Sequence, residues 1–222
     1  MPTASEPIVC YVTHQKSLGG DDLARSVLAK IEMAIAAGVS WVQIREKDLP
    51  GRELFELARA AVGVAAGRSA LVFVNDRLDV ALAAGAAGVH LGGESLDARD
   101  VVRWRRGGNA PVGFRVGVSC HSVEEVREAE RAGADYAFFG PIFDTPAKRK
   151  FGAPQGTAKL AEACAAVRMP VIAIGGVDAS SGAECVRAGA AGVAAIRMFQ
   201  EANSAAELAA VLGRLRSASG KI

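Results

Sequence analysis

The stretch RAGADYAFF, residues 131–139, ends a helical pattern at a glycine and continues into a short apolar run. A glycine just past a helix, followed by aromatic or branched residues, is typical of a helix end that leads into a buried strand. The same pattern occurs three more times, and the glycines are roughly 50 residues apart. The other copies are AAGVSWVQI at residues 36–44, AAGAAGVHL at 83–91 and RAGAAGVAAI at 187–196.

Each interval between these copies is too long for one strand–helix unit and fits two. The additional strands are visible as IVCYVT from residue 8, LVFVN from 71, FRVGVS from 114 and PVIAIGG from 170. Stretches at 54–64, 123–132 and 158–167 have an apolar period near that of a helix and predict helices between the strands. Eight buried strands alternating with helices predict a closed (β/α)₈ TIM barrel, with an open doubly wound sheet as the alternative.

The composition is typical of one globular enzyme domain. The chain has 222 residues, half of them hydrophobic, which suits a single TIM-barrel domain over residues 1–222. Its 26 Lys and Arg residues nearly balance 24 Asp and Glu residues. The sequence has no block of Lys and Arg of the length typical of nucleic-acid or membrane binding, so we expect a small-molecule partner. Four widely spaced cysteines and an N-terminus unlike a signal peptide favour a cytoplasmic location.

Polar residues follow several of the predicted strands directly. Active sites of such barrels form at the carboxyl ends of the strands, so these residues are candidates for chemistry. They are Gln43, Arg45, Glu46 and Lys47 after the second strand, Asn75, Asp76 and Arg77 after the third, His90, Glu94 and Ser95 after the fourth, and Ser119, His121 and Ser122 after the fifth. At any one position a helix-capping role is as consistent as a functional one, as in the capping box of Ser122 and Glu125. Polar residues in six loops together favour a functional role over capping.

Two regions are suited to anions. Gly175 and Gly176 end the seventh strand, and Ile196 and Arg197 end the eighth. Loops after these two strands bind phosphate through backbone N–H groups in many barrels, so we expect a phosphate there. On the opposite side, Arg45, Lys47 and Lys148 supply cations for a second phosphate or a carboxylate.

His121 is the candidate for proton transfer. It follows a strand directly, where an imidazole can exchange protons near neutral pH, although a capping or packing role is equally consistent with the position. Cys120 alternates with its neighbours and is better interpreted as buried packing than as a nucleophile. His90, at the end of an apolar strand, is interpreted as a core histidine.

Six motifs in order resemble the thiamine phosphate synthase and TenI superfamily over nearly the whole chain. They are VQIREK (42–47), VNDRLDVAL (74–82), GVHLG (88–92), GVSCHS (117–122), DYAFFGPIFDT with Lys148 (135–148) and PVIAIGGV (170–177). The resemblance implies a (β/α)₈ barrel that binds a thiazole phosphate at the loops after the seventh and eighth strands. It is also compatible with a homodimer.

In the synthase branch, the resemblance implies that Mg²⁺ assists the departure of diphosphate from hydroxymethylpyrimidine diphosphate while the thiazole nitrogen attacks. Asp76 matches one metal aspartate, whereas HLGGES has Ser95 where the synthase pattern HLGQED has the other. Asn75, Asp76, Lys148 and Arg45 would hold diphosphate and metal, and either Glu94 or Ser95 would occupy the second metal position. The loop DTPAK retains Thr145 and Lys148 but has Ala147 in place of a second threonine.

TenI-type proteins are similar, but they are thiazole tautomerases that aromatise a thiazole carboxylate phosphate by metal-free proton transfer. Ser95, the Ser119–His121–Ser122 group and the Asp144–Thr145 pair match their pattern, and His121 matches their proton-transfer histidine. The main hypothesis is therefore a tautomerase that needs no cofactor. A Mg²⁺-dependent synthase is the alternative, and a non-catalytic barrel that binds a thiazole phosphate is a third hypothesis.

The main hypothesis assigns catalysis to His121, and Asp76 becomes a metal ligand only in a synthase. The candidate substrate-binding residues are Gln43, Arg45, Lys47, Asn75, Ser119, Thr145, Lys148, Gly175, Gly176, Ile196 and Arg197.

Overall fold

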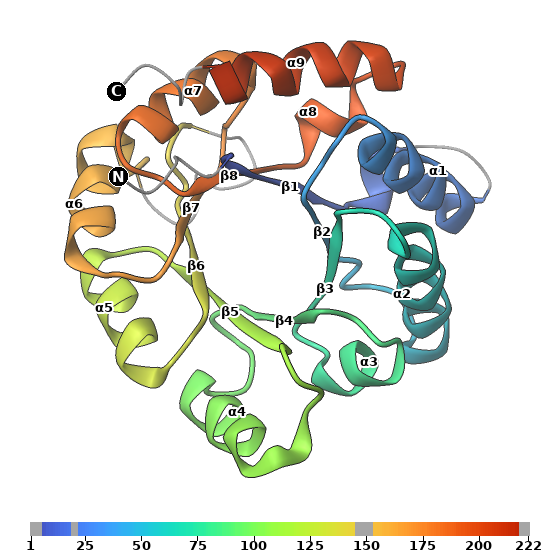
Figure 1. The fold of residues 1–222 in the computed structure, drawn as a ribbon, viewed down its shortest axis with the longest axis horizontal. Coiled ribbons are helices and arrows are strands. Elements are labelled where there is room, and N and C mark those ends of the chain that lie inside the picture. Colours follow the sequence, from blue (N-terminus) through green and yellow to red (C-terminus); the bar gives the residue numbers. More distant parts are fainter. Residues whose placement is uncertain (1–5, 19–21, 145–152, 218–222) are drawn as a thin grey trace.

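Eight parallel strands form a closed barrel in the computed structural model of the chain, which describes residues 6–18, 22–144 and 153–217 (Figure 1). The strands pair in chain order, and β8 pairs back with β1. They are β1 (Ile8–Val12), β2 (Trp41–Ile44), β3 (Leu71–Asn75), β4 (Gly88–Leu91), β5 (Arg115–Cys120), β6 (Tyr136–Phe139), β7 (Val171–Ile174) and β8 (Gly192–Ala195). The predicted (β/α)₈ barrel is confirmed, and the open-sheet alternative is wrong because the sheet closes.

Helices surround the ring of strands (Figure 1). They are α1 (Leu23–Ala36), α2 (Gly51–Ala65), α3 (Leu78–Ala83), α4 (Ala98–Trp104), α5 (Val123–Ala132), α6 (Gly156–Ala166), α7 (Ala179–Arg187), α8 (Arg197–Gln200) and α9 (Ala205–Ser217). Two short helical turns, η1 (Gln15–Ser17) and η2 (Arg105–Asn109), complete the set among the described residues. The three stretches with helical period coincide with or overlap α2, α5 and α6, since one apolar face of each helix packs on the strands.

Aromatic side chains fill the inside of the barrel. The rings of Trp41, Phe73 and Tyr136 lie 4.7 to 5.4 Å apart, centroid to centroid. A second apolar layer, including Val27 and Ile31 of α1, lies between the strands and the helices. The strands are buried on both faces, which is why their sequences are continuously apolar rather than alternating.

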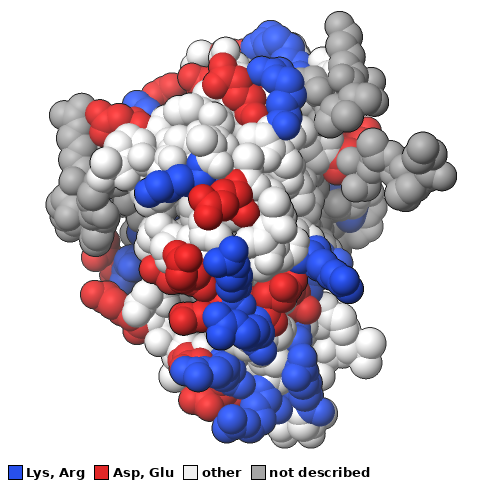
Figure 2. All heavy atoms as spheres, turned by 90° about the vertical axis from the view of Figure 1, so that its left-hand side faces the viewer, with Lys and Arg blue, Asp and Glu red and all other residues white. Residues whose placement is uncertain are grey.

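Charged side chains of both signs are interspersed on the face shown in Figure 2, which carries α5 and α6. Mixed charge of this kind is consistent with the near-neutral balance of the chain. Among the helices of the described residues, none combines the length and apolar character needed to cross a membrane.

Gly117 makes room for the ring of Tyr136 in the barrel interior. A methyl group at this position would lie 2.0 Å from the Tyr136 ring. We expect Gly117→Ala to lower the free energy of unfolding by about 1–3 kcal/mol through overpacking, measured by urea denaturation.

Gly63→Ala is the matched control, because its added methyl group would have no neighbour within 4 Å and it lies inside α2. This change should stabilise the protein by about 0.5–1 kcal/mol through helix propensity. Equal effects of the two substitutions would contradict this account of the barrel interior.

Candidate active site

A chain of polar side chains crosses the carboxyl ends of β2 and β3. The buried Gln43 donates from Nε2 to Oδ1 of Asn75 at 3.0 Å, and Asn75 donates from Nδ2 to Oδ2 of Asp76 at 2.5 Å. Lys47 places its ammonium group 4.0 Å from the same Asp76 oxygen. Four of the residues singled out from the sequence therefore lie together, and they combine amide, carboxylate and cation at one edge.

The other oxygen of Asp76 is held by the loop after β4. Asp76 Oδ1 accepts from the Gly92 N–H at 3.2 Å and from the Ser95 hydroxyl. The Ser95 oxygen in turn accepts from the Gly92 N–H at 2.7 Å. Ser95 therefore faces the site, while Glu94 is exposed on the loop, which answers the question that the HLGGES motif left open.

Asp76 adopts an uncommon backbone conformation, with φ of 61°. Residues other than glycine rarely occupy this left-handed region, although Asp and Asn tolerate it better than most. Its N–H donates to the His90 carbonyl at 2.8 Å, so the chain turns at the end of β3 while remaining attached to β4. This turn brings the carboxylate over the barrel edge.

His90 belongs to the barrel interior beneath this edge. Its Nδ1 lies 3.2 Å from the Tyr136 hydroxyl and its Nε2 lies 2.9 Å from Ser119 Oγ. Burial lowers the pKa of His90 to about 3, the charge of Asp76 opposes this shift, and Arg45 adds to it. His90 is therefore a neutral core histidine, and Ser119 is half-buried with its hydroxyl engaged by His90.

His121 is exposed at the end of β5. Its Nδ1 lies 2.5 Å from the Gly140 carbonyl, which can only accept, so Nδ1 is the donor of this hydrogen bond. The Ser122 side chain accepts from the Glu125 N–H at 3.1 Å, as a helix cap should. The expected capping box differs in its second bond, because Glu125 accepts from the His121 N–H instead, at 2.6 Å.

Gly175 and Gly176 let the loop after β6 lie close to the end of β7. Both have φ in the left-handed region, and methyl groups on them would come within 2.7 Å of Pro141 and Phe143. The Phe143 N–H donates to the Gly175 carbonyl at 2.9 Å. The glycine pair thus has a packing role, and phosphate binding there remains a prediction.

The remaining candidates lie around this edge or outside the described residues. Arg45 is half-buried and its N–H donates to Thr13 Oγ1 at 3.0 Å. Ile196 precedes α8, and Arg197 is exposed at its first position. Thr145 and Lys148 fall outside the described residues, so their predicted roles stay predictions.

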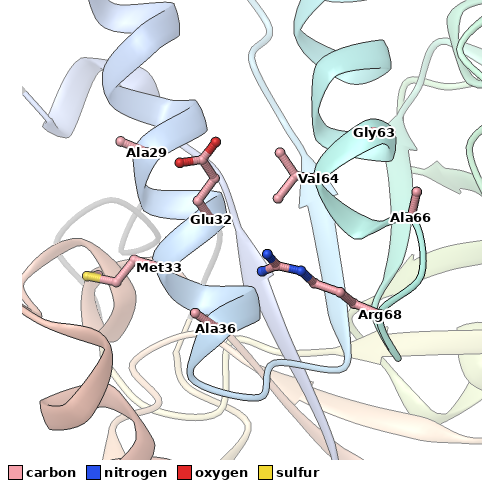
Figure 3. Close-up of a pocket in the computed structure, with 8 residues that line it drawn as sticks. All are labelled: Ala29, Glu32, Met33, Ala36, Gly63, Val64, Ala66 and Arg68. Carbon is pink, nitrogen blue, oxygen red and sulfur yellow. The ribbon is translucent and has the colours of Figure 1, made fainter.

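A surface cleft of about 720 Å³ lies away from this edge, between α1 and α2 (Figure 3). Glu32 of α1 and Arg68 extend into it from opposite sides. Arg68 leads into the amino end of β3, so the cleft is at the opposite end of the barrel from the polar network.

Sequence reasoning missed Tyr136, and it named Glu46 as a candidate without showing which way its side chain points. Tyr136, the buried partner of His90, reads in the sequence as an ordinary strand aromatic. Glu46 is only 5% exposed and accepts from the Gln15 N–H at 2.8 Å, so it faces inward although it lies between two candidate cations. The signal for Glu46 was present in VQIREK, where a charged residue follows the strand directly.

The family model described as thiamine monophosphate synthase matches residues 9–199. The chain belongs to the thiamine monophosphate synthase family. A protein of Moorella thermoacetica named thiamine-phosphate synthase is 41% identical over 206 residues, with 93% of each chain covered. One of Chlorobium luteolum with the same name is 36% identical over 224 residues and covers 99% of this chain and 100% of its own.

A solved structure of the family agrees with the fold. Thiamine phosphate pyrophosphorylase from Pyrococcus furiosus superposes with a TM-score of 0.80 at 28% identity, and the match covers 98% of both chains. The resemblance found in the sequence motifs is confirmed. The names of these relatives favour the synthase alternative over the tautomerase hypothesis.

The buried His90 gives this family member a pH-dependent stability. Its pKa is depressed from 6.5 to about 3 in the folded state, so only the unfolded chain binds the proton between these values. Stability from this group is complete above about pH 6.5 and is lost as the pH falls. We expect the decrease in unfolding free energy from pH 7 to pH 5 to be about 2 kcal/mol larger in the wild type than in His90→Gln.

Urea denaturation of both proteins at the two pH values measures this difference. Other titrating groups contribute equally to both and cancel in the comparison. An identical pH dependence in the two proteins would show that His90 is not held neutral by burial.

Proposed function

We propose that this protein is a thiamine-phosphate synthase, a transferase that joins hydroxymethylpyrimidine diphosphate to a thiazole phosphate. In this reaction the thiazole nitrogen forms a bond to the pyrimidine methylene carbon, and the bond from that carbon to the diphosphate oxygen breaks. Diphosphate leaves with the electron pair. The observation that supports this most is the Gln43–Asn75–Asp76 network beside Lys47 at the strand edge.

The network is suited to a diphosphate. Gln43 orients the Asn75 amide, which leaves its NH₂ group aimed at the Asp76 carboxylate. Lys47 is half-exposed and supplies a mobile positive charge at the same place. Arg45, on the same loop, adds a guanidinium, the group best matched to a phosphate oxygen pair.

Asp76 also fits the Mg²⁺ that synthases of this family use. Its side chain is 33% exposed, and Mg²⁺ commonly takes one or two carboxylates together with substrate phosphates and water. Among the described residues no group of three or more His, Cys, Asp or Glu side chains is gathered, and Asp76 is the carboxylate that we propose for the metal. Bound Mg²⁺ would neutralise charge on the departing diphosphate.

The protein residues then have separate tasks. Ser95 and the Gly92 N–H bind one oxygen of Asp76, and the other oxygen, which accepts from Asn75 and lies beside Lys47, is the one that would bind the metal. Lys47 and Arg45 bind the diphosphate, and Lys148 is a third candidate. Gly175, Gly176, Ile196 and Arg197 are proposed to hold the thiazole phosphate, and Ser119 and Thr145 to line the site.

A tautomerase remains the second candidate because of His121. Its Nδ1 donates to the Gly140 carbonyl, which leaves Nε2 as the ring nitrogen that would exchange a proton with a substrate. Ser95 also matches the tautomerase pattern. The assay that separates the two uses purified protein with each substrate set, and thiamin phosphate formed only with both synthase substrates and Mg²⁺ supports the synthase.

Replacing Asp76 should remove synthase activity without unfolding the protein. Asp76→Asn keeps the side-chain size and an oxygen acceptor for Gly92 and Ser95, but it loses the charge for the metal. We expect kcat/KM to fall about 100-fold or more. Unchanged activity in a folded variant would exclude Asp76 from the metal site.

Replacing Ser95 should change the metal requirement in the opposite direction. Ser95→Asp adds a second carboxylate beside Asp76, so we expect the Mg²⁺ concentration for half-maximal rate to fall about tenfold. Mn²⁺ binding followed by electron paramagnetic resonance should tighten in parallel. Ser95→Ala is the control, and a variant that binds metal no better than Ser95→Ala would contradict the placement of Ser95.

A further inference from the structure

Glu46 is a buried charged residue to which the proposed reaction assigns no task. It is 5% exposed, and its Oε2 accepts from the N–H of Gln15, itself 7% exposed, at 2.8 Å. Its other oxygen is buried and has no hydrogen-bond partner among the described residues. A buried carboxylate is costly to desolvate, so its retention here calls for a specific role.

The segment that Glu46 holds is the turn after β1. Thr13 donates its N–H to the Gln43 carbonyl at 2.9 Å and accepts from the Arg45 N–H at 3.0 Å through its hydroxyl. With the bond from Gln15 to Glu46, the turn meets the end of β2 at three successive places. The turn and the segment that carries Arg45 and Lys47 are therefore one hydrogen-bonded unit.

The same turn is attached to the loop after β8. Gln200 of α8 donates from Nε2 to the His14 carbonyl at 2.8 Å and accepts from the Ser17 hydroxyl at 2.5 Å. An exposed ion pair between Lys16 and Asp48, at 2.7 Å, joins the turn once more to the segment after β2. The turn thus lies between the strand ends proposed for the two phosphate groups.

Burial differs sharply between Glu46 and its neighbours. Lys47 is exposed and Arg45 half-buried, whereas Glu46 is buried against η1. Holding the Glu46 carboxylate inward therefore determines which way the flanking cations face. Without that bond, the short segment after β2 has fewer contacts that select one orientation.

We propose that Glu46 is a positioning residue whose hydrogen bond to the Gln15 N–H directs Arg45 and Lys47 toward the substrate diphosphate. This inference rests on the proposed synthase function for its kinetic consequence. Its structural part, the orientation of two cations toward a diphosphate, is testable by binding alone.

The test compares Glu46→Ala, Glu46→Gln and Asp48→Asn in the full-length protein. Gln keeps an oxygen acceptor for the Gln15 N–H, while Asp48→Asn removes only the exposed ion pair of the same segment. We expect Glu46→Ala to raise KM for the pyrimidine diphosphate about tenfold with a smaller change in kcat, because the loss is in binding. Glu46→Gln and Asp48→Asn should stay within about threefold of the wild type.

Gln15→Pro tests the same bond from the other side. Proline removes the N–H donor at the first position of η1, where its ring is tolerated, and leaves Glu46 in place. It should reproduce the KM increase of Glu46→Ala. Circular dichroism confirms that each variant compared is folded. If Glu46→Ala does not fold, Gln15→Pro supplies the loss of the bond, and an unchanged KM in folded Gln15→Pro would overturn the proposal.

Calorimetric binding of inorganic diphosphate with Mg²⁺ separates the two proposals. Weaker binding in Glu46→Ala, restored in Glu46→Gln, supports the positioning role even if the wild type forms no thiamin phosphate, a result that would reject the synthase function alone. Unchanged KM and diphosphate affinity in folded Glu46→Ala would overturn the positioning role. Equal losses in Glu46→Ala and Glu46→Gln would also overturn it, since they would show that charge and not the hydrogen bond matters.

Discussion

The Asp76 carboxylate is anchored where β3 and β4 end, and the arrangement of the site depends on that anchor. Its backbone lies in a region that costs a residue other than glycine of the order of 1 kcal/mol or more. Hydrogen bonds from Gly92 and Ser95 to one carboxylate oxygen and from Asn75 to the other offset this cost and fix the direction of the carboxylate. Two strands and one loop must be in place before this carboxylate has a defined direction, so the closed barrel is a precondition of the chemistry.

Hydrogen bonds and packing contacts below and on either side of Asp76 restrict the loops around it. Beneath it, the neutral His90 is bonded to Ser119 and Tyr136, so the polar floor is fully paired despite its burial. On one side, Gly175 and Gly176 allow the loop after β6 to approach β7. On the other, Glu46 fastens the turn after β1 to the end of β2. These contacts differ in kind, but all of them restrict loops at the carboxyl ends of the strands.

The sequence was sufficient for the barrel because the strands are buried on both faces over most of their length, which makes the runs largely apolar. It also located the edge of the site, since Gln43 and Asn75 lie at the carboxyl ends of strands and Asp76 directly follows one. The direction of individual side chains was not predictable. Whether Glu94 or Ser95 faces Asp76 depends on the loop backbone after β4, and the inward turn of Glu46 depends on η1, which is distant in sequence. The packing role of the glycine pair likewise depends on Phe143, from another loop.

The tautomerase hypothesis and the comparisons diverge because they rest on different parts of the sequence. Ser95 and His121 match the tautomerase pattern at single positions, whereas relatives named as synthases match nearly the entire chain.

The most direct test of the account is a crystal structure of the protein with Mg²⁺ and diphosphate. The account predicts the metal at about 2.0–2.1 Å from the Asp76 oxygen that accepts from Asn75, with Ser95 still bonded to the other oxygen and the diphosphate beside Lys47. A metal bound elsewhere, with Asp76 outside its coordination shell, would contradict it.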